Sequence, residues 1–91
     1  MKTVFTAEAK KQLKAILTYL ETEWSARVRN RFLEQLRKSV KIIEQYPKAY
    51  PASDKFFEAR RCVVVPQVSL FYRIEGETII ALALMDNRQD F

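Results

Sequence analysis

The fold of this 91-residue chain is decided by the stretch Val68-Ser69-Leu70-Phe71-Tyr72-Arg73-Ile74-Glu75-Gly76-Glu77-Thr78-Ile79-Ile80-Ala81-Leu82-Ala83-Leu84-Met85. Residues 68–74 are rich in β-forming side chains, and residues 78–85 are apolar on both faces, as in a strand covered on both sides. Between them, Glu75-Gly76 contains the only glycine of the chain, where a tight turn needs a positive φ. The stretch therefore predicts a β-hairpin.

A third strand is predicted just upstream of this hairpin. Residues 57–65 are also rich in β-formers, and Pro66-Gln67 separates them from the next strand as a turn. Residues 47–54 contain two of the three prolines and are predicted to form a loop. The three strands together form an antiparallel meander.

Two amphipathic helices are predicted before this loop. The first covers residues 7–23 with Thr6 as its N-cap, and the second covers residues 26–46, from the N-cap Ser25 to Pro47. A break this short between two helices implies a helical hairpin. With a short strand at residues 2–5, the order is β-α-α-β-β-β. The expected fold class is α+β: one domain over residues 1–91, with the helical hairpin packed on an antiparallel sheet.

The composition narrows the possible chemistry. The chain has no histidine and one cysteine, Cys62, so structural zinc sites and nucleophilic catalysis by a Ser-His or Cys-His pair are excluded. No cofactor or metal is expected. Sixteen Lys and Arg against eleven Asp and Glu give a net charge of +5, which suits an anionic partner such as a nucleic acid or an acidic protein. The lone cysteine and the lack of a long apolar run predict a cytoplasmic protein outside the membrane.

Two groups of arginines stand out. Arg27, Arg29 and Arg31 crowd the start of the second helix, where the helix dipole disfavours cations. Glu21 and Glu23, at the end of the first helix, are placed to neutralise them; the alternative is an arginine patch for an anionic partner.

The second group lies in the meander. Two-residue turns would place Arg60 opposite Arg73, and would put Arg61 on the face under the helices. Glu58 and Glu75 are close enough in sequence to make this a solvated charge cluster. The alternative is a clamp for a phosphate or carboxylate.

One ordered set of features runs through the whole chain. It comprises a short strand followed by Thr6-Ala7-Glu8-Ala9-Lys10-Lys11-Gln12-Leu13, two helices, Leu70-Phe71-Tyr72-Arg73-Ile74, an acidic-Gly turn, a two-sided apolar strand and Asp86-Asn87-Arg88-Gln89. In this order the features resemble the RelE/ParE toxin superfamily, the toxins of type II toxin–antitoxin modules, also known as plasmid stabilisation proteins.

The resemblance implies a growth-inhibiting toxin that a cognate antitoxin neutralises, and it leaves two targets open. ParE-like members poison DNA gyrase by binding, and this alternative is favoured because a terminal Tyr or His-Tyr of RelE-like enzymes is missing from Asp90-Phe91. RelE-like members bind the ribosome and cleave mRNA, so whether the protein is an enzyme stays open. The catalytic residues of such a nuclease would be Arg60, Arg73 and Arg88. A third alternative is a non-toxic nucleic-acid-binding or scaffold domain.

The resemblance also implies how the antitoxin binds. Such antitoxins lay a disordered or helical, often acidic, segment across the helices and the sheet edge, and the complex sets the oligomeric state. Candidates for that surface are the aromatic residues Trp24, Tyr46, Tyr50 and Phe56.

Overall fold

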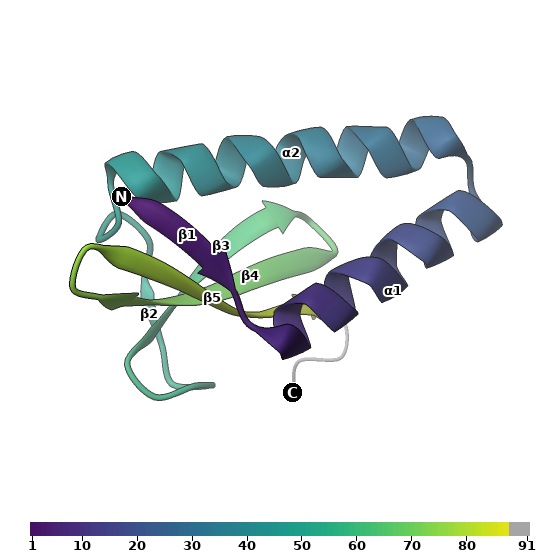
Figure 1. Ribbon diagram of the computed structural model, residues 1–91. Helices are drawn as coiled ribbons and strands as arrows, with labels where there is room; N and C mark the ends of the chain where they lie inside the picture. The colour runs from purple at the N-terminus through teal and green to yellow at the C-terminus, as the bar shows by residue number, and fades with distance from the viewer. Residues whose placement is uncertain (88–91) are drawn as a thin grey trace.

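Two helices pack on one face of a five-stranded sheet (Figure 1). The computed structural model describes residues 1–87. The elements follow in the order β1 (Lys2–Phe5), α1 (Ala7–Glu23), α2 (Ala26–Gln45), β2 (Ala52–Ser53), β3 (Ala59–Val65), β4 (Val68–Glu75) and β5 (Thr78–Asp86). The α+β class and both predicted helices are thus confirmed. Neither helix is long and apolar enough to span a membrane, within the part of the chain described.

The sheet is mixed, so the expected all-antiparallel sheet is wrong in one respect. The strand order is β1-β5-β4-β3-β2, and β1 pairs with β5 in parallel, while the other neighbouring strands are antiparallel. The helical hairpin explains this, because it carries the chain across one face of the sheet before β5 pairs with β1. The predicted loop also contributes the two-residue strand β2, which pairs with Ala59 and Arg60.

The predicted register between β3 and β4 is wrong by one residue. Val65 pairs with Val68 as expected, but Val63 rather than Val64 pairs with Ser69, because Val64 is the extra residue of a β-bulge. Arg60 therefore lies opposite Tyr72 and not opposite Arg73. Since a shift of one residue exchanges the two faces of a strand, Arg61 points away from the helices.

Local capping fixes the ends of the helices. Thr6 Oγ1 accepts a hydrogen bond from the backbone N–H of Ala9 and donates one to the carbonyl of Leu82, so the start of α1 is attached to β5. Ser25 Oγ accepts from the N–H of Val28 at the start of α2. Gly76 has the predicted positive φ, 62°, in the turn between β4 and β5.

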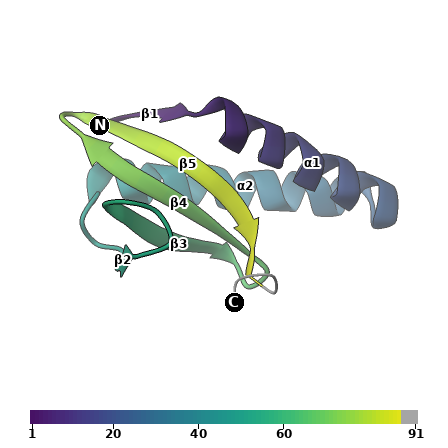
Figure 2. The same cartoon turned by 90° about the horizontal axis from the view of Figure 1, so that it is seen from below.

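The core lies between α2 and the helix-facing side of β3, β4 and β5. Figure 2, which views the sheet from the side without helices, shows α2 running behind these strands. Tyr72 and Leu70 at the centre of β4 are completely buried. The other buried members of the core are Phe32, Leu36, Ile43, Cys62, Val64, Val68, Ile79, Ala81 and Leu84.

Candidate functional site

Arg60 is held by the loop that follows α2. It lies on the helix-facing side of β3, and its Nη1 donates to the carbonyl oxygens of Tyr50 at 2.7 Å and Lys48 at 3.1 Å. Beside it, the Tyr72 hydroxyl donates to the carbonyl of Pro47 at 2.6 Å. Burial raises the pKa of Tyr72 to about 12, and the positive charge of Arg60 partly opposes this rise. Arg60 thus secures the loop against the sheet.

Arg73 lies on the other face of the sheet. Its Nη1 donates to the carbonyl of Phe57 at 2.8 Å, and its Nε contacts Oε2 of Glu75 at 3.1 Å. Because Arg60 and Arg73 occupy opposite faces, the structure does not bring them together around one anion. Arg88, the third predicted catalytic residue, lies outside the described residues.

A polar network that sequence reasoning missed surrounds Arg61. Its Nε donates to Ser69 Oγ at 2.9 Å and its Nη2 to Asn87 Oδ1 at 2.8 Å, while Ser69 Oγ donates to the same Asn87 oxygen at 2.6 Å. Asn87 Nδ2 in turn donates to the carbonyl of Pro66. Ser69 is fully buried, so its hydroxyl needs these partners. The network fastens the end of β5 to the β3–β4 turn.

The structure buries the one cysteine and shows no metal-binding cluster in residues 1–87. Cys62 is 1 % exposed, and burial raises the pKa of its thiol above the ordinary value, so it remains a neutral core residue. Groups of three or more His, Cys, Asp or Glu side chains that could hold a metal ion are absent from this part of the chain.

An apolar groove lies between the helical hairpin and the β3–β4 turn. It arises because the α1–α2 connection extends past the end of the sheet (Figure 1), so that Ala9 is the only α1 residue that is fully buried. The apolar groove has a volume of about 840 Å³. Most of its lining residues are apolar or aromatic, among them Ile16, Tyr19, Leu20, Trp24, Val28, Phe32 and Val65. The polar or charged residues Arg31, Gln35, Gln67 and Asp86 also line it.

The predicted aromatic surface residues separate into two pairs. Trp24 is 68 % exposed at the apolar groove, and Tyr46 is 63 % exposed at the far end of α2. Tyr50 instead packs edge-on against Tyr72, with ring centroids 6.4 Å apart, and Phe56 packs similarly on Phe71 at 5.4 Å. Trp24 is therefore the one predicted aromatic residue that lines the groove.

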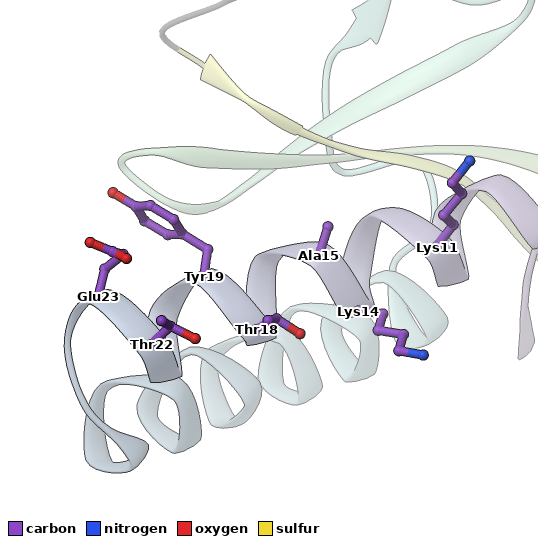
Figure 3. Close-up of a pocket in the computed structure, with 7 residues that line it drawn as sticks. All are labelled: Lys11, Lys14, Ala15, Thr18, Tyr19, Thr22 and Glu23. Carbon is purple, nitrogen blue, oxygen red and sulfur yellow. The ribbon is translucent and has the colours of Figure 1, made fainter.

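A second depression, on the outward side of α1, has a different character. Figure 3 shows that its lining residues all come from α1 and that their side chains diverge, with Tyr19 and Lys11 pointing one way and Lys14 another. A ligand site needs polar groups that converge. The depression therefore lacks the geometry of a binding site.

Comparison with known families assigns the chain. The sequence model of the ParE toxin of the type II toxin–antitoxin system parDE matches residues 3–91. The chain belongs to the ParE toxin family. Its role is therefore that of the toxin in a toxin–antitoxin module. A comparison with curated proteins finds no match.

Solved structures agree with this ParE assignment at the level of the fold. The chromosomal ParDE system of P. aeruginosa matches with a TM-score of 0.80 and 17 % identity, over 94 % of this chain and 95 % of the other. A YoeB/ParE toxin from Agrobacterium tumefaciens matches with a TM-score of 0.69 and 14 % identity, over 96 % and 99 %. A metal-bound toxin from Helicobacter pylori matches with a TM-score of 0.69 and 18 % identity, over 100 % and 99 %.

Proposed function

We propose that this ParE-family toxin stops growth by binding DNA gyrase in the cytoplasm, not by cleaving mRNA. The observation that carries the proposal is that the sheet arginines are held apart and are bound within the chain. RNA cleavage needs cations that converge on the scissile phosphate and a group that activates the ribose 2′-hydroxyl. Arg60 and Arg73 lie on opposite faces and each donates to two acceptors of its own chain. The sequence also has no histidine to serve as a base.

A supercoiling assay tests this proposal directly. Purified toxin added to bacterial DNA gyrase and relaxed plasmid should reduce supercoiling, and addition of the antitoxin encoded beside it should restore the activity. In parallel, the toxin should leave mRNA intact on translating ribosomes. Full gyrase activity together with mRNA cut in the ribosome would overturn the proposal and would support the nuclease built on Arg60, Arg73 and Arg88.

We further assign the antitoxin contact to the apolar groove. The groove is lined mostly by apolar and aromatic side chains, many of them from the helical hairpin, which is what an amphipathic helix of a partner requires. Trp24 lines the groove with 68 % of its surface exposed, so a partner could bury a large apolar area there. Arg31 also lines the groove, so an acidic residue of the antitoxin could pair with it there.

Two matched aromatic substitutions test the antitoxin contact. Trp24→Ala should weaken antitoxin binding about 30-fold or more, the effect of removing an aromatic residue at the centre of an interface. Tyr46→Ala removes an aromatic side chain of similar exposure, 63 %, away from the groove and should leave binding unchanged. Calorimetry with the purified antitoxin provides the dissociation constants. Equal losses in the two variants, or a loss for Tyr46→Ala alone, would place the antitoxin elsewhere.

A further inference from the structure

The outward face of α2 is strongly basic along most of its length. The buried residues Phe32, Leu36 and Ile43 define the side of the helix that faces the core. At 100° per residue, the opposite side carries Arg27, Arg31, Arg37, Lys38 and Lys41 with one acid, Glu34, and all six are exposed. This basic face therefore has a surplus of four positive charges.

Most of these charges have no role in holding the fold together. Lys38 faces Glu34 at 3.8 Å, and nearby Arg29, off the basic face, pairs with Glu21 across the helical hairpin. Arg27, Arg37 and Lys41 have no hydrogen-bond or ion-pair partner among residues 1–87. Arg27 moreover lies in the first turn of α2, where the helix dipole opposes a cation. Arg27, Arg37 and Lys41 thus contribute little to the stability of the fold.

The chemistry of the basic face indicates what covers it. The one exposed large apolar residue of α2, Ile42, lies at the border of this face, so the face has few of the anchors that a protein segment would bury. The apolar groove holds many more. It also lacks the aromatic rings on which the bases of a single strand would stack. A band of cations with few apolar anchors matches the phosphate backbone of a duplex.

We propose that the basic face of α2 binds the phosphate backbone of double-stranded DNA. Arg27 and Lys41 are separated by 14 residues, or about 21 Å along the helix axis, which corresponds to about six base pairs. The choice of DNA over another duplex rests on the proposed function, because gyrase holds the toxin next to the DNA on which it acts. Arg31 borders the apolar groove, so contact through Arg27, Arg37 and Lys41 leaves the groove and the sheet free for protein partners.

Two triple variants with equal charge test the inference. Arg27→Gln/Arg37→Gln/Lys41→Gln removes three charges from the basic face, and Lys10→Gln/Lys11→Gln/Lys14→Gln removes three exposed charges from α1. Both leave the purified toxin with the same net charge and retain side chains that favour a helix. Fluorescence anisotropy with a labelled duplex of about 20 base pairs, over a range of salt concentrations, provides affinity and salt slope.

The inference predicts unequal losses. The α2 variant should bind the duplex at least about tenfold more weakly, with a salt slope smaller by about two to three, while the α1 variant should bind like the wild type. If circular dichroism shows that the α2 triple variant does not fold, Arg37→Gln alone should lower the slope by about one.

Equal losses in the α1 and α2 variants would overturn the inference, as would binding of an RNA duplex or polyglutamate as tight as binding of DNA. Wild-type toxin that inhibits gyrase but binds no DNA would overturn this inference alone, and toxin that binds DNA without inhibiting gyrase would overturn only the proposed function.

Discussion

The arginines of the sheet and those of α2 differ in what their guanidinium groups contact. Arg60, Arg61 and Arg73 each donate to two acceptors within the chain. Arg27 and Arg37 on α2 donate to none among residues 1–87. The comparison shows that a net charge of +5 does not locate a binding surface by itself, because part of that charge is used to hold the chain together. Only the cations without internal partners remain for an external anion.

Among substitutions of these arginines, the largest loss in the free energy of unfolding is expected at Arg61. Arg61→Met keeps an apolar stem but removes both donors to Ser69 and Asn87. The free energy of unfolding should fall by about 2–3 kcal/mol, because hydrogen bonds from a charged donor to half-buried acceptors are lost. Urea unfolding followed by circular dichroism measures it. A double-mutant cycle with Asn87→Ala should show coupling between the two positions, and strict additivity would mean that Arg61 and Asn87 do not stabilise each other.

Arg60→Met should have a smaller effect, of about 1–2 kcal/mol. The substitution leaves the carbonyls of Lys48 and Tyr50 without their donor, but the Lys48 bond is exposed, so water can replace it. The same urea titration provides the value. A loss as large as that of Arg61→Met would mean that the loop after α2 and the end of β5 depend equally on their arginines, and a larger loss would reverse the predicted order.

The stability of the protein should depend on alkaline pH through Tyr72, which lies beside Arg60. The folded-state pKa of Tyr72, about 12, lies above the ordinary value of 10.0. Between pH 10 and 12 the unfolded chain therefore binds fewer protons than the folded protein, and stability should fall as the pH rises through this range. Below pH 10 this contribution is constant.

Chemical unfolding at several alkaline pH values, with Tyr72→Phe as the control, tests this expectation. The decline should be smaller in the control, because its ring cannot ionise. In Arg60→Met the phenol of Tyr72 should ionise at a still higher pH, since the neighbouring positive charge is gone. A Tyr72→Phe variant with an unchanged alkaline profile would assign the decline to other groups.

The smallest effect is expected on α2. Arg27→Gln/Arg37→Gln/Lys41→Gln should change the free energy of unfolding by less than about 0.5 kcal/mol, because exposed side chains without partners are replaced by another helix former. The thermal midpoint and the urea midpoint should both stay at the wild-type values. A loss comparable to that of Arg60→Met would erase the distinction between the two groups of arginines.

The sequence predicted the helices well because their signals are local. Thr6 and Ser25 each cap a helix where expected, and helix 1 ends at the predicted residue 23. The turn at Gly76 was also predictable, because a hairpin turn needs a residue with a positive φ and glycine adopts it most easily. The parallel pairing of β1 with β5 was not, because it is set by the path of the chain around the sheet.

The faces on which the sheet arginines lie were predicted wrongly, because of one residue, Val64. The β-bulge at Val64 shifts the register of β3, so Arg60 and Arg61 exchange faces relative to the regular ladder. The network of Arg61, Ser69 and Asn87 depends on that shift, and no spacing in the sequence signals it. The charge prediction at the helical hairpin was partly confirmed: Arg29 pairs with Glu21. The catalytic assignment of Arg60, Arg73 and Arg88 stays a prediction.

Induced expression in a bacterial host, with mRNA 5′ ends and the SOS response followed in the same culture, tests most directly whether the toxin acts by binding. The account predicts SOS induction and filamentation while translated mRNAs stay uncut. Rapid loss of protein synthesis, with new mRNA ends in translated frames and no SOS response, would contradict it.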